Sequence, residues 1–206
     1  MRLGVFGGSF DPVHIGHLLL AETCREQCRL DQVWFLPAAV APHKQGKGTA
    51  PAKHRLAMLE LALAGHAAMI VSALEIDRGG ISYTVDTLRE IRRSQPAAEL
   101  FLLMGADSLP ELPSWYQADE ICRLALPVVV RRPGAPEPDF GVLADLATAE
   151  RLQEIRARQL ESPQIDVSSS EIRQRVSAGR SIRYQVPRAV EKYIETNGLY
   201  GGERGQ

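Results

Sequence analysis

The chain has 206 residues, of which 45% are hydrophobic and 24% charged, and its 24 Lys and Arg against 25 Asp and Glu give a net charge of −1. These values allow a substantial core, exclude global disorder and disfavour a dedicated DNA- or RNA-binding protein. No apolar run approaches the ~20 residues needed to cross a bilayer, and the N-terminus lacks the charged-then-apolar plan of a signal peptide. We therefore expect a cytoplasmic protein without a membrane partner. Its three cysteines, with no C-x-x-C pair, predict neither a disulfide framework nor a zinc site.

The first 130 residues alternate short apolar runs with longer amphipathic segments. The predicted elements are a strand at 2–6, a helix at 15–30, a strand at 32–36, a polar loop at 38–50, a helix at 51–63, a strand at 69–76, a helix at 83–93, and strands at 99–104 and 126–130. The apolar runs are continuous, which is typical of strands that are covered on both faces. This order predicts an α/β fold with a Rossmann-like, doubly wound parallel sheet, whose ligands bind beyond the carboxyl ends of the strands.

The remainder of the chain is expected to be mainly helical. A Pro-rich loop at 133–138 leads to a charged amphipathic helix at 142–160, a short strand at 164–167, and helices at 169–178 and 187–196, the last one stopped by Asn197-Gly198. We predict a single domain over residues 1–200, whose C-terminal helical part spans about 168–200. Residues 201–206 are expected to be a frayed tail.

The turn after the first strand, GGSFDPVHIGH at residues 7–17, is the most informative segment. Its two leading glycines allow the backbone to approach a ligand closely, and the helix that follows turns its free N–H groups and positive dipole end toward the same edge. His14 and His17 are three positions apart, so both imidazoles lie on one side of the first helical turn and could donate hydrogen bonds to a polyphosphate. The alternative, that they only cap a helix, fits a histidine pair behind a double-glycine turn less well.

Competing ligand-binding motifs are missing from the sequence. The first strand and turn do not supply the G-x-G-x-x-G of a dinucleotide site. Gly46-Lys47-Gly48 lacks the upstream glycine and the final hydroxyl of a Walker A loop, and no H-E-x-x-H zinc motif is present. A phosphate site built on the first turn remains the favoured interpretation.

Residues 7–17 resemble the GGSFDPxHxGH signature of the nucleotidylyltransferase superfamily, in the long form of bacterial nicotinate-nucleotide adenylyltransferases. The core (H/T)-x-G-H also resembles class I aminoacyl-tRNA synthetases, so the specificity lies in the full eleven positions. Further resemblances follow in order up to about residue 200: Pro42-His43-Lys44, Lys53-x-Arg55-x-x-Met58, Ser82-Tyr83-Thr84-x-Asp86-Thr87-Leu88, Gly105-x-Asp107 with Trp115 eight positions on, and Val167-Ser168-Ser169-Ser170-x-Ile172-Arg173. In the last of these, Ser170 stands where the family usually has Thr, which keeps the hydroxyl.

The resemblance implies adenylyl transfer from ATP to nicotinate mononucleotide, giving deamido-NAD and pyrophosphate in NAD synthesis. The phosphate of the mononucleotide would be the nucleophile, and Mg²⁺ would be held mainly through the ATP phosphates, without a protein metal site. The matched motifs imply three groups of residues: catalytic His14, His17, Lys44 and Arg173; ATP-binding Gly7, Gly8, Ser9, Phe10, Gly105, Asp107, Ser168, Ser169 and Ile172; and mononucleotide-binding Ser82, Tyr83, Thr84 and Trp115.

Several of these residues keep a second interpretation. Asp107 could cap the following helix as well as bind ribose, and Trp115 could belong to the core instead of stacking on a pyridine ring. Asp86 fits a favourable charge at a helix N-terminus better than a catalytic base. Arg131 and Arg132 could be no more than a solvated strand end.

Two other functions stay open at this point. One is an adenylyltransferase for nicotinamide mononucleotide or phosphopantetheine, although the phosphopantetheine enzymes match residues 82–88 and the chain length poorly. The other is a non-catalytic nucleotide-binding protein of the same fold, which the presence of His14, His17, Lys44 and Arg173 disfavours. The expected partners are ATP and the mononucleotide, without nucleic acid, and assembly into a homo-oligomer is left open.

Overall fold

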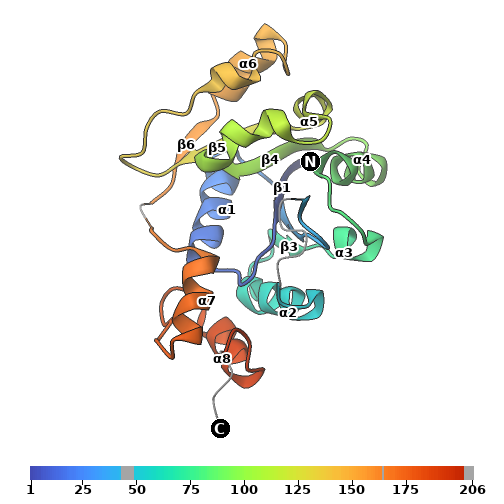
Figure 1. The fold of residues 1–206 in the computed structure, drawn as a ribbon. Helices are drawn as coiled ribbons and strands as arrows, with labels where there is room; N and C mark the ends of the chain where they lie inside the picture. Colours follow the sequence, from blue (N-terminus) through green and yellow to red (C-terminus); the bar gives the residue numbers. More distant parts are fainter. Residues whose placement is uncertain (43–48, 164, 202–206) are drawn as a thin grey trace.

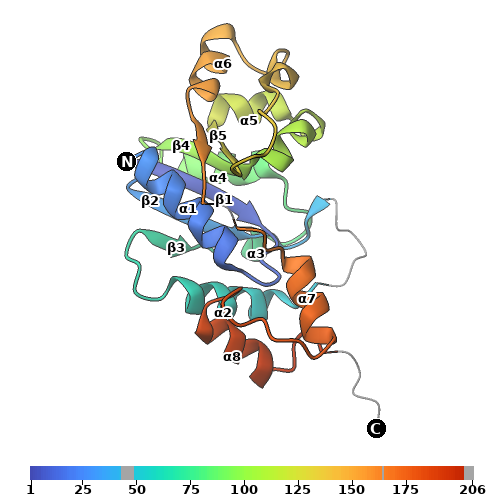
Figure 2. The ribbon, with the colours of Figure 1, turned by 90° about the vertical axis from the view of Figure 1, so that its left-hand side faces the viewer.

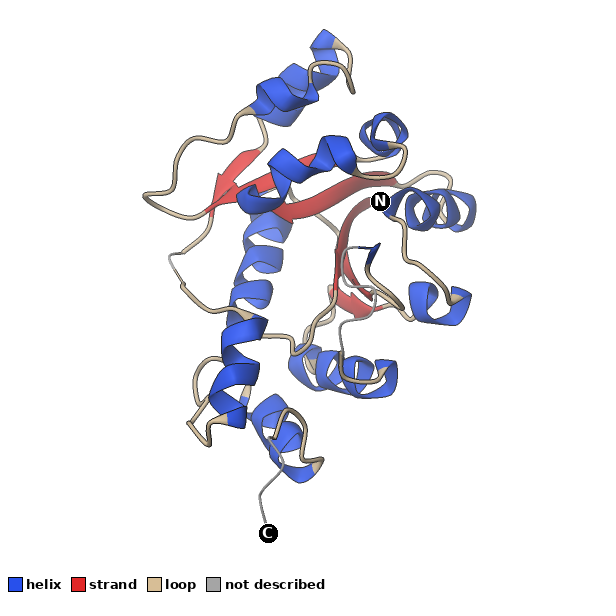
Figure 3. Ribbon diagram, viewed as in Figure 1, coloured by secondary structure: helices blue, strands red, loops and turns tan. Residues whose placement is uncertain are grey.

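A parallel six-stranded sheet forms the centre of the protein (Figure 3). The structure, a computed structural model, describes residues 1–42, 49–163 and 165–201. Its strands are β1 (Arg2–Gly8), β2 (Gln32–Pro37), β3 (Met69–Val71), β4 (Glu99–Gly105), β5 (Leu126–Arg131) and β6 (Gln159–Glu161). They are ordered β3-β2-β1-β4-β5-β6, and every neighbouring pair is parallel. The predicted Rossmann-like α/β class is confirmed.

Helices cover both faces of this sheet. Two of them, α1 (Ile15–Gln27) and α2 (Ala52–Leu63), connect β1 to β2 and β2 to β3 and lie on one face, whereas α4 (Thr84–Ser94) and α5 (Ala118–Leu124) lie together on the other (Figure 1). The central strands are therefore buried on both sides, which explains the continuous apolar run from Leu100 to Met104. Within the described part of the chain, no helix has the length and apolar character that a membrane crossing needs.

The C-terminal helical part consists of α7 (Ser169–Ser177) and α8 (Arg188–Thr196). It docks against the main body through α8, which packs beside α2 (Figure 2). One polar contact in this interface joins His54 Nδ1 and the Tyr193 hydroxyl at 3.0 Å. This docking places the start of α7 next to the turn that follows β1.

The strand predicted at 69–76 is wrong in its second half. Only Met69–Val71 pair with β2, and the Ser72 amide then donates to the Phe35 carbonyl where the chain leaves the sheet. The next residues form the short helix α3 (Leu74–Arg78). In this helix the Glu75 side chain is buried and accepts a hydrogen bond from the Thr87 hydroxyl. This tertiary contact accompanies the helix in place of the predicted strand.

The long helix predicted at 142–160 and the strand predicted at 164–167 are also wrong. The segment divides into a 3₁₀ turn η3 (Phe140–Leu143), helix α6 (Ala149–Arg156) and strand β6. A threonine causes the division, because the Thr148 hydroxyl accepts the Arg151 amide at 3.2 Å and so starts a new helix. Residues 165–167 have no regular structure, and Gln164 lies outside the described residues.

The sequence did not predict the exact elements between β4 and β5, where a 3₁₀ helix η2 (Ala106–Ser114) precedes α5. Helix α1 begins at the predicted residue but ends earlier, since Arg29 adopts a left-handed conformation with φ of 50°. The expected tail at 201–206 lies outside the described residues from 202 onward.

Close packing at Gly4 in β1 gives a stability prediction. A Cβ at this position would lie 2.9 Å from Leu30 Cδ1 and 3.1 Å from Val33 Cγ2, both in the core, whereas a Cβ at Gly7 would meet no atom within 4 Å. We expect Gly4→Ala to lower the free energy of unfolding by about 1–2 kcal/mol through overpacking. The control Gly7→Ala should stay within about 0.5 kcal/mol of the wild type in urea denaturation. Equal stability of the two variants would contradict this account of the core.

Candidate active site

The candidate site lies where the order of the strands reverses, between β1 and β4. β1 ends at Gly8 and β4 ends at Gly105, so the two strands present their carboxyl ends side by side. Such a switch point is where open α/β sheets bind ligands. Gly7 is exposed, and no atom lies within 4 Å of the position where a Cβ would stand, so its backbone is open to a ligand.

His14 and His17 form a stacked pair at the start of α1. Their ring centroids are 3.7 Å apart and the ring planes are inclined by 28°. The His14 backbone N–H donates to His17 Nδ1 at 3.2 Å. Because Nδ1 of His17 accepts this bond, a neutral His17 ring carries its proton on Nε2 and presents that atom as a donor.

The His14 ring is buried without a full set of partners. Its side chain is 7% exposed, and among the described residues no hydrogen-bond partner is found for the buried Nδ1. Burial, and secondarily the charge of Arg132, lowers the pKa of His14 from its ordinary 6.5 to about 4. A Cβ at Gly16 would lie 3.1 Å from two atoms of this ring, so glycine allows the ring to lie against the helix. His14 is thus neutral at pH 7 in the free protein.

Phe10, which is predicted to bind ATP, has its side chain in the core. Its ring is packed among Phe6, Phe35 and His17, with centroid separations of 5.4, 5.6 and 5.0 Å, and its backbone is left-handed at φ 48°. The predicted ATP-binding Ile172 is likewise fully buried. Any contact of these two residues with ATP must therefore go through the backbone, and the Phe10 ring supports His17.

The N-terminus of α1 offers fewer free amides than the sequence predicts. The Ile15 amide donates to the Gln185 carbonyl at 3.0 Å, and the His17 amide donates to the His14 carbonyl at 3.0 Å. The protein thus already uses part of the donor set that we expected to face an anion. For an anion at this edge, the two imidazoles and the exposed Gly7 backbone therefore offer more possible donors than the N-terminus of α1 does.

Helix α7 brings the second predicted phosphate motif to the same place. Ser168 caps the helix by accepting the Glu171 amide at 3.1 Å, and the Ser169 hydroxyl donates to the Pro12 carbonyl at 2.9 Å. Arg173 Nη1 donates to the Asp11 carbonyl at 2.6 Å, and its Nη2 donates to Ser170 Oγ at 3.2 Å. The guanidinium of Arg173 therefore lies beside the turn that carries His14.

Asp107 and Arg132 face each other at the ends of β4 and β5. Asp107 lies within η2 and does not cap it, because Gly105 occupies the cap position, and the Asp107 side chain is 76% exposed. Arg132 Nη2 approaches Asp107 Oδ2 to 4.0 Å, and its Nη1 lies 3.4 Å from Asp166 Oδ1. Arg131 instead binds Glu137 and Glu161 and so belongs to the strand end. Arg132 is the one of this pair that faces the site.

Two of the predicted mononucleotide residues stand at the start of α4, and a third lies on a neighbouring segment. Tyr83 occupies the cap position and Thr84 the first helical position, while Trp115 follows the end of η2 and is half-buried against the core. The rings of Tyr83 and Tyr116 lie 4.9 Å apart, which joins the two segments. Tyr116 is 53% exposed and adds an aromatic surface that the sequence analysis did not assign.

Ser82 is buried and makes its hydrogen bonds within the protein. Its hydroxyl accepts the Ala39 amide at 2.9 Å, and its own amide donates to the Val40 carbonyl at 2.9 Å. The nearby buried Glu75 accepts the Thr87 hydroxyl at 2.6 Å, and burial raises the pKa of Glu75. These contacts fix the approach to α4, so Ser82 acts on the candidate site through the shape of this segment.

Of the predicted catalytic residues, Lys44 lies outside the described residues. Among side chains that the sequence analysis did not assign to the site, the structure adds Asp11, Arg55 and Tyr200, which meet at the turn after β1. Asp11 and Arg55 belong to motifs that the sequence analysis identified. Nothing in the sequence indicated that these two charged side chains are buried. Over residues 1–42, 49–163 and 165–201, no group of three or more His, Cys, Asp or Glu is placed to hold a metal ion.

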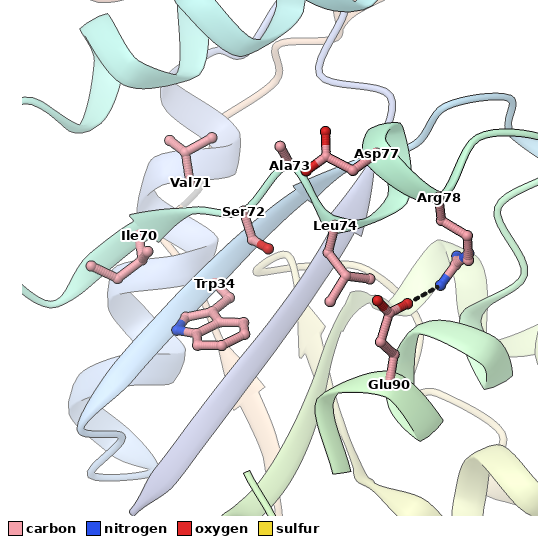
Figure 4. A pocket seen from close by; sticks show the side chains of 9 residues that line it. All are labelled: Trp34, Ile70, Val71, Ser72, Ala73, Leu74, Asp77, Arg78 and Glu90. Atoms are coloured by element: carbon pink, nitrogen blue, oxygen red, sulfur yellow. Dashed lines mark hydrogen bonds and ion pairs between the residues drawn. The ribbon is translucent and has the colours of Figure 1, made fainter. Parts of the chain in front are cut away.

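A separate pocket of about 680 Å³ lies between β2, β3, α3 and α4 (Figure 4). Trp34 lines it, together with Arg78 and Glu90, which form an ion pair at 3.1 Å. None of the residues predicted for the active site lines this pocket. The pocket is therefore separate from the candidate site at the carboxyl ends of β1 and β4.

Known proteins are similar to this chain in sequence and in fold. Residues 5–175 match the model of the cytidylyltransferase-like family. The chain is 47% identical, over 97% of its length and 91% of the relative's, to a probable nicotinate-nucleotide adenylyltransferase of Thermomicrobium roseum. It is also 47% identical, over 97% of its length and 100% of the relative's, to one of Thermus thermophilus. Among solved structures it resembles Plasmodium falciparum nicotinic acid mononucleotide adenylyltransferase complexed with NaAD, with a TM-score of 0.74, 16% identity and 97% coverage of both chains, which shows the shared fold.

The lowered pKa of His14 predicts how stability depends on pH. The unfolded chain binds more protons than the folded one between pH 6.5 and pH 4, so the free energy of unfolding should fall as the pH falls through this range. Between pH 7 and pH 5 the wild type should lose about 2 kcal/mol more than His14→Asn, whose side chain does not titrate and suits the cap position of α1. Urea denaturation at the two pH values measures this difference. Parallel pH profiles of the two proteins would refute a buried, neutral His14.

Proposed function

The chain belongs to the nicotinate-nucleotide adenylyltransferases of the cytidylyltransferase-like family, and we propose that it transfers the adenylyl group of ATP to nicotinate mononucleotide. The products are deamido-NAD and pyrophosphate, which makes it an enzyme of NAD biosynthesis. The observation that carries the proposal is the stacked pair of His14 and His17 beside the open backbone of Gly7. Two imidazoles held at the carboxyl edge of β1 form a donor site for a polyphosphate.

The proposed chemistry needs no protein nucleophile. A phosphate oxygen of the mononucleotide attacks the α-phosphorus of ATP, the bond from this phosphorus to the bridging oxygen breaks, and pyrophosphate leaves with the electron pair. Catalysis then depends on alignment of the two anions and on donors placed where negative charge builds up. His17, with its proton on Nε2, would donate to the phosphates. The neutral His14 would assist from the adjacent position.

The remaining ATP contacts follow from the elements that surround the histidines. Arg173 and the start of α7, with Ser168 and Ser169, would hold the β- and γ-phosphates, and Lys44 would join them. The backbone at Gly7, Gly8 and Ser9 would receive the phosphates closely, with Phe10 and Ile172 contributing only main-chain atoms. Gly105 and the exposed carboxylate of Asp107 would bind the ribose.

We propose Mg²⁺ as the divalent metal that accompanies ATP. Mg²⁺ prefers oxygen ligands and retains several waters, so the ATP phosphates and water suit it better than a protein cage would. When bound, the metal neutralises charge on the phosphate oxygens. The contribution of the chain is to orient those phosphates through His14, His17 and Arg173.

The mononucleotide would bind at the start of α4. Nicotinate carries a ring carboxylate, which the Thr84 and Val85 amides can bind because helical N1 and N2 amides lack an intrahelical acceptor. The Tyr83 amide is a weaker candidate than the sequence suggests, since it donates to the Ile81 carbonyl at 3.2 Å. Trp115 would stack on the pyridine ring, and the exposed Tyr116 would extend this surface.

Other expectations from the sequence are retained as proposals. Residues 1–200 would fold as one unit, which the continuous core from Leu3 to Ile194 supports. The protein would act in the cytoplasm on small molecules, without nucleic acid or membrane partners, as a monomer or a homo-oligomer.

The role of His17 can be tested by turnover. His17→Ala should lower kcat for pyrophosphate release by about 10²–10³-fold, because one preorganised donor to the developing charge is lost. His66→Ala removes a partly exposed imidazole that pairs with Glu22, and should leave kcat within about twofold of the wild type. A His17→Ala enzyme that turns over within threefold of the wild type would eliminate the catalytic role.

The choice of base tests the proposed mononucleotide site. The NH₂ of nicotinamide is itself a hydrogen-bond donor and would face the backbone N–H donors unfavourably. The ring carboxylate of nicotinate accepts from them in charge-assisted hydrogen bonds. We expect kcat/KM to favour nicotinate mononucleotide by at least about 10²-fold, equivalent to ~3 kcal/mol. Trp115→Ala should weaken both mononucleotides and leave most of this ratio in place, because stacking does not distinguish the bases. Equal kcat/KM values would favour an enzyme of dual specificity.

A further inference from the structure

A carboxylate with no part in the chemistry above lies buried in the turn that carries the histidines. Asp11 is 1% exposed, and its Oδ1 accepts the Tyr200 hydroxyl at 2.6 Å and the Ala50 amide at 3.2 Å. Its Oδ2 lies 3.8 Å from Arg173 Nη1, while the Asp11 carbonyl accepts from the same nitrogen at 2.6 Å. Asp11 therefore connects Tyr200 to a residue that we place on the ATP phosphates.

The main chain of the same turn is held from several directions. The buried Arg55 donates to the Ser9 carbonyl at 3.0 Å and to the Ala50 carbonyl at 3.0 Å. Ser169 holds the Pro12 carbonyl from α7. The backbone on either side of Asp11 is thus already fixed, which leaves the orientation of the carboxylate itself to Tyr200 and Ala50.

Tyr200 is built to donate to this carboxylate. It follows α8 in a left-handed conformation, with φ of 61°, and its ring is partly buried against the core. Burial and the neighbouring Asp11 carboxylate both raise the pKa of the Tyr200 hydroxyl. The hydroxyl therefore stays protonated at neutral pH, and Asp11 Oδ1 is occupied.

We propose that Tyr200 is a positioning residue for Arg173. By occupying Oδ1 of Asp11, the Tyr200 hydroxyl directs Oδ2 toward the Arg173 guanidinium, and so holds that group beside the turn with the histidines in the orientation that ATP requires. This inference rests on the proposed function, because it assigns Arg173 to the phosphates.

The same helical part offers a matched control. Tyr193, on α8, also uses its hydroxyl, but this hydroxyl bonds to His54 Nδ1 at the interface with α2. Loss of either hydroxyl removes one hydrogen bond between the C-terminal helical part and the rest of the protein. Only loss of the Tyr200 hydroxyl should change how Arg173 meets ATP.

The test is a double-mutant cycle on ATP affinity. Tyr200→Phe, Arg173→Ala, the double variant and Tyr193→Phe are compared with the wild type by calorimetry with ATP, by KM for both substrates, and by thermal unfolding. Tyr200→Phe should weaken ATP by about tenfold and leave the mononucleotide KM within about twofold, on the scale of one hydrogen bond to a charged group. In the Arg173→Ala background the same change should weaken ATP by less than about twofold.

The outcomes separate positioning from support of the fold. A tenfold loss from Tyr200→Phe in both backgrounds, an equal loss from Tyr193→Phe, or no change in ATP affinity would overturn the proposal. If Arg173→Ala does not fold, Arg173→Lys replaces it, since lysine cannot span the Asp11 carbonyl and Ser170 Oγ with one planar group. A wild-type enzyme that releases no pyrophosphate with any mononucleotide would refute the proposed function, while the ATP affinities would still report the coupling.

Discussion

The pairing of one buried carboxylate constrains the whole candidate active site. A charge with 1% exposure is costly unless hydrogen bonds and opposite charges compensate it, and the compensation for Asp11 comes from Ala50, Arg173 and Tyr200. These partners belong to the segment before α2, to α7 and to the segment that follows α8. The sheet edge, α2 and the C-terminal helices must therefore be assembled around Asp11 before the turn with the histidines takes its shape.

The histidines acquire their properties from this assembly. His14 is held neutral by burial and by Arg132, and His17 is oriented by the His14 amide and supported by the Phe10 ring. The free protein thus presents a neutral His14 imidazole near the Arg132 guanidinium, while Arg173 is bonded to the same turn. Donors that are already oriented need little rearrangement when a polyanion arrives, which is the condition for electrostatic stabilisation of a transition state.

The sequence predicted those features that local patterns determine. The glycines after β1, the common face of His14 and His17 and the parallel sheet all follow from short-range spacing and from apolar runs. It failed where tertiary contacts decide, as at Glu75, whose burial against Thr87 accompanies a helix in place of a predicted strand, and at Thr148, whose cap divides a predicted helix. Nothing local indicates that Phe10 is buried or that Asp11 meets a tyrosine 189 positions away.

That long separation bears on the order in which the molecule gains and loses structure. The contacts that hold the turn after β1 join residues 157, 162 and 189 positions apart, so each closes a very long loop of chain. Contacts of such high contact order form late in folding, because the entropy of loop closure must be overcome first. If the C-terminal helices detach as a local unit, the sheet can persist while the turn loses its anchors. Mild denaturant would then abolish activity before the sheet itself unfolds.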